Sequence, residues 1–136
     1  MTSDYWSTLQ LLSVAARAVQ RQSAAYLKAL GLPQLGLHIL ENLNERSPIL
    51  QSELARLVMA RTQTIGTVLT TLENNRWVIR QRGLMHNQVA VSITEQGRTL
   101  LITAQECLRR LQLPTDAEDL RPFLAAIINR TARNSA

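Results

Sequence analysis

The sequence predicts a mainly α fold of the α+β class, in which one small β-hairpin interrupts a run of helices. Apolar residues recur at three- and four-residue spacing over most of the chain, which is typical of amphipathic helices. Residues 89–93 instead alternate large apolar with small side chains, the two-residue period of a half-buried strand. Gly31, Pro48 and Pro114 separate these segments. A length of 136 residues suits one domain, so we expect a single domain over 1–136.

The first part of the chain predicts three helices and a very short strand. Gly31 closes the first helix, because glycine readily takes the left-handed conformation of a helix end, and Pro33 prevents its continuation. Leu54, Leu57 and Val58 form the expected core face of the third helix. The expected ranges are 4–30 for the first helix, 33–44 for the second, 49–50 for the strand and 51–58 for the third helix.

The next helix is amphipathic in an unusual way. Ile65, Val68, Leu69 and Leu72 follow the i, i+3, i+4, i+7 spacing of one apolar stripe. Threonine is a poor helix former, so the many threonines opposite that stripe are better explained by contact with bases and phosphates than by helix stability. The opposite face carries Thr62, Gln63, Thr64, Gly66, Thr67, Thr70 and Thr71, with Arg61 at its entry.

Two strands and two further helices follow. Gly83 lies in the tip between the strands, and Thr94 is suited to cap the next helix, because its hydroxyl can accept from free backbone N–H groups. Pro122 is tolerated only in the first turn of a helix, which favours a start of the last helix near Asp119 over one near Thr115. The strands are expected at 77–80 and 89–93, and the helix after them from 95 to about 113.

A helix, a tight turn, a second helix and a hairpin in this order describe a winged helix-turn-helix, which we place at about 33–94. The flanking helices, about 4–30 and 95–132, are apolar along most of their length. In so small a chain, such helices most simply bury each other across the two-fold axis of a homodimer; the alternative is that they cover only the core of their own monomer. The predicted dimer contacts are Leu9, Leu12, Leu120, Phe123, Leu124, Ile127 and Ile128.

Charge and cysteine content point to a basic protein of a reducing compartment. The net charge is +5, and Lys28 is the only lysine among the 15 basic residues. Arginine favours bidentate and phosphate contacts, so a polyanionic partner fits this composition. Cys107 is the only cysteine, which excludes an intrachain disulfide. The start of the chain lacks the pattern of a signal peptide, and we expect a cytoplasmic protein without a membrane partner.

The residue patterns do not predict an enzyme. There is no Gly-rich phosphate loop, no H-E-x-x-H motif, and no defensible Ser/His/Asp or Cys/His arrangement. His38 and Glu41 share one helix face and His86 lies in the hairpin, but a metal site needs further ligands at a clear spacing. We therefore expect no catalytic residues, no metal and no cofactor.

Four segments together resemble the MarR family of bacterial transcription regulators: LQSELARLV at 50–58, TIGTVLTTLE at 64–73, WVIR at 77–80 and VSITEQGRTLL at 91–101. The helix order on both sides agrees, so the resemblance covers nearly the whole chain. It implies a triangular homodimer with one winged helix-turn-helix per subunit that binds a palindromic DNA operator. It also implies control by a small phenolic or other amphipathic ligand, or by cysteine oxidation.

The resemblance also suggests where DNA and effector bind. The family's wing usually holds an Asp-x-Arg pair, but Met85 and Asn87 occupy those positions here, so the wing contact falls to Arg80, Arg82, His86 or Asn87. The family turn usually contains glycine, where this chain has Met59. The predicted DNA-binding residues are Arg61, Thr62, Gln63, Thr64, Gly66, Thr67, Thr71, Arg80, Arg82 and Asn87. The predicted effector pocket is lined by Trp6, Arg17, Tyr26, His38 and Trp77.

The sequence thus predicts a sequence-specific duplex-DNA-binding transcription regulator, a repressor of MarR type under the control of a small effector. One alternative is a protein-interaction module whose altered wing has weakened DNA binding. A second is a redox-responsive regulator that uses Cys107, although this residue lies on the apolar stripe of its helix, where a free cysteine usually serves as a small hydrophobe.

Overall fold

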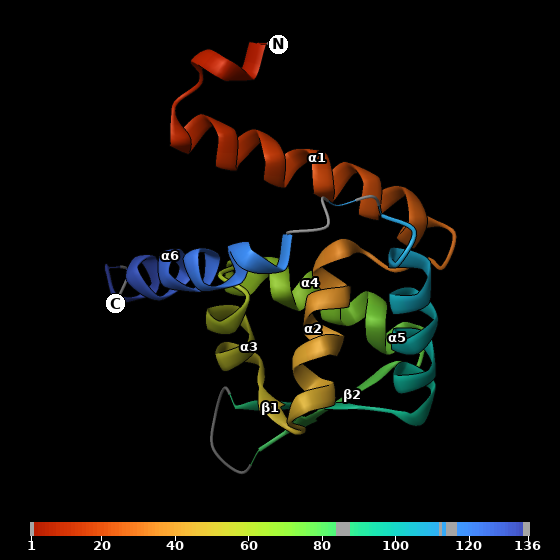
Figure 1. The fold of residues 1–136 in the computed structure, drawn as a ribbon. Helices are drawn as coiled ribbons and strands as arrows, with labels where there is room; N and C mark the ends of the chain where they lie inside the picture. The colour runs from red at the N-terminus through yellow and green to blue at the C-terminus, as the bar shows by residue number, and fades with distance from the viewer. Residues whose placement is uncertain (1, 84–87, 112, 114–116, 135–136) are drawn as a thin grey trace.

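The computed structural model describes residues 2–83, 88–111, 113 and 117–134 (Figure 1). It has the predicted mainly α architecture with one small antiparallel sheet. The elements run in the order η1 Thr2–Tyr5, α1 Thr8–Lys28, α2 Gln34–Glu45, β1 Ile49–Leu50, α3 Gln51–Leu57, α4 Thr62–Asn74, β2 Val78–Arg82, β3 Val89–Ile93, α5 Glu95–Leu108, η2 Ala117–Leu120 and α6 Arg121–Asn134.

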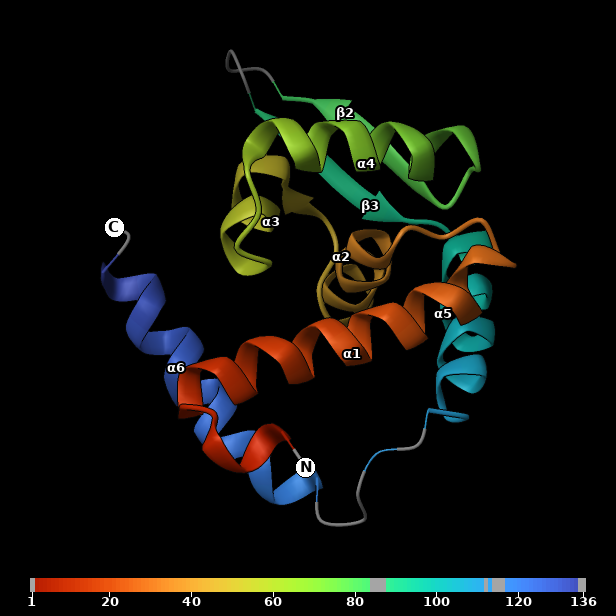
Figure 2. The same ribbon diagram turned by 90° about the horizontal axis from the view of Figure 1, so that it is seen from above.

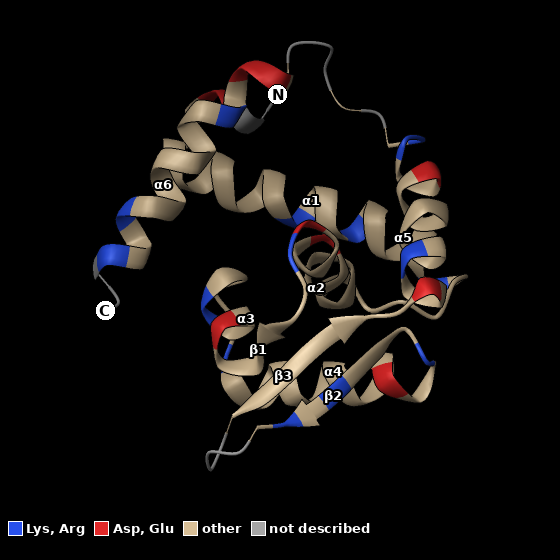
Figure 3. Cartoon of the chain, turned by 90° about the horizontal axis from the view of Figure 1, so that it is seen from below, with Lys and Arg blue, Asp and Glu red and all other residues tan. Residues whose placement is uncertain are grey.

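The three strands pair in the order β1-β3-β2, so that β2 is an edge strand. Val78 lies opposite Ile93 and Arg80 opposite Val91 in the β2–β3 hairpin, and Ile49 of β1 also pairs with Val91. Helix α4 lies behind one face of this sheet, as seen from below in Figure 3. This register turns Val78, Val91 and Ile93 toward the helices, because alternate strand residues share one face.

The core lies where α2, α3 and α4 meet this face of the sheet, and α1 and α5 close it from one end. Helix α1 crosses α2 and α5, whereas α6 lies on the side of the molecule opposite α5 (Figures 1 and 2). The largest fully buried side chains are aliphatic and come from seven elements, α1 to α5 with β2 and β3: Leu27, Ile39, Leu40, Leu43, Leu54, Ile65, Leu69, Leu72, Val78, Val91 and Leu101. The winged helix-turn-helix is therefore well packed within one chain.

Two helix ends adopt the hydrogen-bonding pattern of a Schellman motif without glycine. After α3, Ala60 N donates to Ala55 O (3.0 Å) and Met59 takes a φ of 53°. After α4, Trp77 N donates to Leu72 O (3.0 Å) and Arg76 takes a φ of 64°. A side chain in this left-handed conformation costs about 1–2 kcal/mol. Met59 therefore keeps the tight turn that the family usually builds with glycine.

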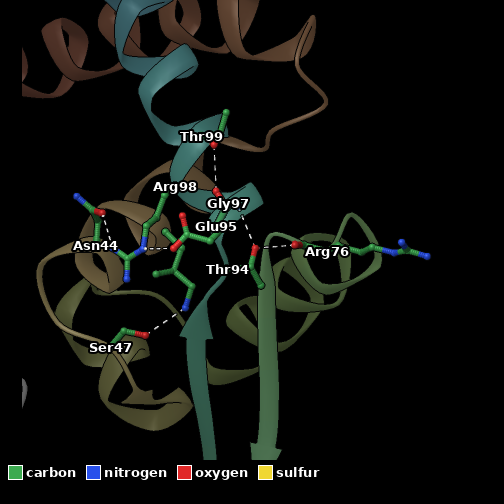
Figure 4. A network of polar contacts seen from close by, with 9 residues as sticks. Asn44, Ser47, Arg76, Thr94, Glu95, Gly97, Arg98 and Thr99 are labelled. Atoms are coloured by element: carbon green, nitrogen blue, oxygen red, sulfur yellow. Dashed lines mark hydrogen bonds and ion pairs between the residues drawn. The ribbon is translucent and has the colours of Figure 1, made fainter.

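A polar network fixes the start of α5 to the end of the hairpin (Figure 4). Thr94 is the predicted N-cap, and its hydroxyl accepts from Gly97 N (3.0 Å) and donates to Arg76 O (2.7 Å). A Cβ atom added to Gly97 would overlap the carbonyl oxygen of Trp77 and would lie 2.9 Å from Ile93 Cγ1. Only glycine allows α5 to approach the hairpin this closely.

Several boundaries differ from the predicted ones. The first helix begins at Thr8 rather than residue 4, because the Ser7 hydroxyl accepts from Gln10 N (3.2 Å) and caps it. Helix α5 ends at Leu108 rather than near 113, and β2 continues to Arg82 rather than ending at residue 80. Helix α6 begins at Arg121, so Pro122 lies in its first turn, as the sequence predicted. The limits of the single domain, 1–136, stay a prediction.

The prediction that Leu57 faces the core is wrong, since its side chain is 47% exposed. At 100° per residue, the buried side of α3 spans about 100°, from Leu54 through Val58 to Ala55. Leu57 lies about 60° outside this span, on the far side of Leu54. A two-turn helix gives too few positions to locate the buried side from the sequence.

Candidate nucleic-acid interface

Helix α4 separates an apolar side from a polar side, as the sequence predicted. Ile65, Leu69 and Leu72 are fully buried, and Val68 is partly buried. The predicted contact residues of this helix lie on the other side: Thr62, Gln63, Thr64 and Thr67 are exposed, and Gly66 and Thr71 are half-buried. The core thus holds α4 by one side only and presents its hydroxyl and amide groups to solvent.

The hydroxyls of α4 are oriented by the helix itself. Thr67 Oγ1 donates to Gln63 O (3.1 Å), and Thr70 Oγ1 donates to Gly66 O (3.0 Å). Because each hydroxyl proton is used in this way, each oxygen is left as an acceptor. Thr70 Oγ1 accepts from Arg80 Nη2 (3.1 Å), whereas Thr67 lies exposed on the polar side of the helix. The side-chain amide of Gln63 has no hydrogen-bond partner among the described residues, so it offers both donors and an acceptor.

Unpaired arginines border this polar side. Arg61 immediately precedes α4, and Arg82 ends β2; both are exposed, and neither forms an ion pair with the residues that the structure describes. Arg76, at the α4–β2 turn, points its guanidinium away from the Thr94 network (Figure 4). Figure 3 shows these basic positions along β2 and at the turn. They frame α4 with positive charge.

Arg80 differs from these arginines because its guanidinium is engaged. Its Nη2 donates to Glu73 Oε1 (3.1 Å) and to Thr70 Oγ1 (3.1 Å). The adjacent Arg80 guanidinium lowers the pKa of the Glu73 carboxyl, so Glu73 is ionised at neutral pH. With Gln51, Arg82 and Val89, the two residues line a hollow of about 300 Å³ between α4 and the hairpin.

Arg56 and Glu73 are residues that the sequence did not single out. Arg56 lines an open cleft of about 590 Å³ beside the α3–α4 turn, together with Arg61 and Thr62, and Ala132 of α6 also lines it. The sequence held one clue, since Arg56 and Arg61 lie on either side of the turn. Nothing in the sequence indicated that Glu73 meets Arg80. Asn87, Met85 and His86, on which the wing predictions fall, lie outside the described residues.

The five residues predicted to line one effector pocket are not brought together within a chain. Trp6 precedes α1 and Tyr26 lies near its end, and at 1.5 Å per residue they are separated by roughly 30 Å. His38 is exposed and its Nδ1 lies 3.5 Å from Glu41 Oε1. Arg17 is exposed on α1, and Trp77 packs against the core. Tyr26 lines a cavity of about 430 Å³ together with Gln22, Ala25, Arg110 and Leu111.

The surfaces predicted to form a dimer interface are open in the single chain. Leu9 and Phe123 are 73% and 70% exposed, and Leu12 is half-buried. The remaining predicted contacts, all exposed, are Leu120, Leu124, Ile127 and Ile128. Helix α6 has no buried residue among those described, so no described element buries its apolar side.

Other predicted features gain no new role. Cys107 is partly buried on α5. Among the residues placed by the structure, no group of three or more His, Cys, Asp and Glu side chains could hold a metal ion. None of the described helices combines the length and the hydrophobicity needed to span a membrane.

Residues 32–84, which include α2, α3, α4 and β2, match the sequence model of the MarR family. The resemblance to the MarR family is confirmed. Solved structures agree with it. The transcriptional regulator BldR from Sulfolobus solfataricus is 29% identical to this chain, with a TM-score of 0.78, over 90% of this chain and 94% of that one. A comparison with curated proteins gave no match.

Two more distant structures share the fold. A MarR-family transcriptional regulator from Rhodococcus sp. RHA1 is 21% identical, with a TM-score of 0.78, over 87% of this chain and 89% of that one. NadR in complex with 4-hydroxyphenylacetate is 19% identical, with a TM-score of 0.71, over 94% of each chain. The chain therefore has the winged-helix fold of MarR regulators, a family of transcription regulators rather than enzymes.

Proposed function

We propose that this chain is a homodimeric MarR-type repressor that binds a palindromic operator in duplex DNA, acts in the cytoplasm, and is released by a small amphipathic effector. The observation that carries the proposal is the outer side of α4. It presents the amide of Gln63 and the exposed hydroxyl of Thr67 between Arg61 and Arg82. Among the described residues, the amide of Gln63 has no hydrogen-bond partner and the two arginines have no ion-pair partner. Base edges are read by such amides and hydroxyls, and phosphates by arginines.

Two further observations support the dimer and the effector. The apolar side of α6 is exposed in the monomer and would be buried by a second copy. The cavity at Tyr26 combines an aromatic ring with the guanidinium of Arg110, which suits an aromatic acid. NadR, which has the same fold, was crystallised with an acid of this kind, 4-hydroxyphenylacetate.

The proposal is tested by fluorescence anisotropy with duplex fragments from the DNA flanking the gene, over a series of salt concentrations. We expect one fragment with a palindrome to bind, with half-site centres roughly 34 Å apart. The logarithm of the affinity should fall linearly with the logarithm of the salt concentration, because bound arginines release counterions. Absence of binding to every fragment, or a flat salt response, would instead favour the protein-interaction module.

Replacing Gln63 with alanine should remove base discrimination and leave phosphate binding intact. The amide can pair with two atoms of an adenine, which contributes about 1–3 kcal/mol of discrimination at one operator position. We expect the preference at that position to be lost in a panel of single-base operator variants, while affinity for random duplex stays unchanged. Gln105→Ala, which removes an exposed glutamine of α5, is the matched control. An equal loss on all sequences would exclude Gln63 as a base reader.

A further inference from the structure

Glu73 is an acidic residue on a surface that is otherwise suited to a polyanion. It lies in the last turn of α4, and both of its carboxylate oxygens accept hydrogen bonds from one residue of the hairpin, Arg80. Oε1 accepts from the Arg80 guanidinium (3.1 Å), and Oε2 accepts from the Arg80 backbone N–H (3.2 Å). One carboxylate therefore fixes both the main chain and the side chain of Arg80.

The backbone bond ties the hairpin to α4. Strand β2 is at the edge of the sheet, and Arg80 N donates to Glu73 rather than to β3. An edge N–H of this kind would otherwise remain without a protein partner. The second bond of the guanidinium, to Thr70 Oγ1, adds another link between β2 and the exposed side of α4. Glu73, Thr70 and Arg80 thereby fix the orientation of the hairpin relative to α4.

The same contacts make the guanidinium of Arg80 less available to a DNA phosphate. Its side chain is 23% exposed, and the hollow that it lines contains two guanidinium groups and one carboxylate. A phosphate that entered this hollow would meet the guanidinium of Arg82, which has no ion-pair partner in the described part of the chain. It would meet Arg80 only together with the negative charge of Glu73. Like charges repel, so the carboxylate disfavours a phosphate at this position.

We propose that Glu73 is a specificity-determining positioning residue, which keeps Arg80 off the DNA phosphates and holds the hairpin against α4. The inference rests on the proposed binding of duplex DNA. Affinity for random DNA is essentially electrostatic and would rise with each additional phosphate contact. Affinity for an operator also depends on base contacts, which need α4 in a defined orientation. Glu73 therefore lowers random binding more than operator binding.

The test is Glu73→Gln, with affinity measured on a random-sequence duplex and on the bound genomic fragment. Glutamine keeps the shape of the side chain and removes its charge, so Arg80 becomes free to contact a phosphate. We expect tighter binding to random duplex and a salt slope steeper by about one per protomer, or about two for the dimer. Between about 50 and 200 mM salt, the dimeric variant should lose roughly tenfold more affinity than the parent. The ratio of operator to random affinity should fall.

Three further variants separate this role from a merely structural one. Arg80→Ala in the parent should leave the salt slope unchanged, whereas Arg82→Ala should lower it by about one per protomer. Adding Arg80→Ala to Glu73→Gln should abolish the steeper slope. Glu73→Asp, which keeps the charge, should retain the slope of the parent.

A slope for Glu73→Gln equal to or shallower than that of the parent would overturn the inference. So would a loss of about one unit of slope per protomer in Arg80→Ala alone, which would mean that Arg80 already contacts a phosphate. The slope of Arg80→Ala remains decisive even if urea titrations show that Glu73→Gln does not fold. Failure of the parent to bind any duplex would instead overturn the proposed function itself, and the inference with it.

Discussion

Gly97→Ala is expected to lower the free energy of unfolding by about 3 kcal/mol or more. We expect few substitutions that add a single methyl group to this chain to destabilise it as much. The added Cβ would overlap the backbone oxygen of Trp77 and approach Ile93 Cγ1 at 2.9 Å. Backbone atoms cannot rotate away as a flexible side chain can, so α5 must separate from the hairpin. The Thr94 hydrogen bonds to Gly97 and Arg76 would be strained by the same movement. Urea unfolding followed by circular dichroism measures the effect.

Gly66→Ala is the matched control, because it makes the same chemical change inside a helix. Its Cβ would meet only the flexible end of Gln51, at 3.3 Å from Nε2. Alanine is favoured over glycine in a helix by roughly 0.5–1 kcal/mol, so this variant should be as stable as the parent or more stable. If Gly97→Ala were also as stable as the parent, the close approach of α5 to the hairpin would be wrong.

The double substitution Ile127→Asp and Ile128→Asp is expected to convert a dimer into monomers. Both side chains are on the apolar side of α6 and are 43% and 52% exposed in the single chain. A carboxylate buried in an apolar interface without a partner is strongly unfavourable. Loss of the second half-site contact should weaken operator binding by about 100-fold or more, since linked sites gain this much in avidity. Light scattering coupled to size exclusion gives the oligomeric state.

Ile79→Asp provides the control for this substitution. Ile79 is 51% exposed on β2, far from α6 in both views of the fold (Figures 1 and 2). We expect this variant to remain a dimer. A soluble dimer formed by the α6 double variant would place the interface elsewhere and would leave the apolar side of α6 without an explanation.

The exposed side of α4 could be predicted from the periodicity of its apolar residues. The spacing of Ile65, Leu69 and Leu72 was enough to place Gln63 and the threonines on the solvent side, because a regular helix converts sequence spacing directly into direction. The limits of β3 and the cap at Thr94 followed in the same way from short-range chemistry. The Leu57 prediction failed because α3 has only two turns, and periodicity needs more.

The site was predictable only in part. The sequence identified Arg80 and Arg82 as equivalent basic residues of the hairpin, yet Arg80 pairs with Glu73 and Arg82 has no ion-pair partner among the residues that the structure places. Arg80 lies seven positions after Glu73, and their contact depends on the turn at Arg76 and on the edge position of β2. The predicted effector residues were chosen by type, but α1 is straight and long enough to keep Trp6 away from Tyr26.

By itself the sequence determined the order of the elements, the polar side of α4 and the apolar character of α6, because each depends on neighbours within one or two turns of the chain. Only the tertiary structure decided that Glu73 pairs with Arg80, that Gly97 lies against the Trp77 carbonyl and that no described element buries the apolar side of α6. Each of these depends on the relative placement of elements. That placement comes from the packing of the whole core, which local spacing does not encode.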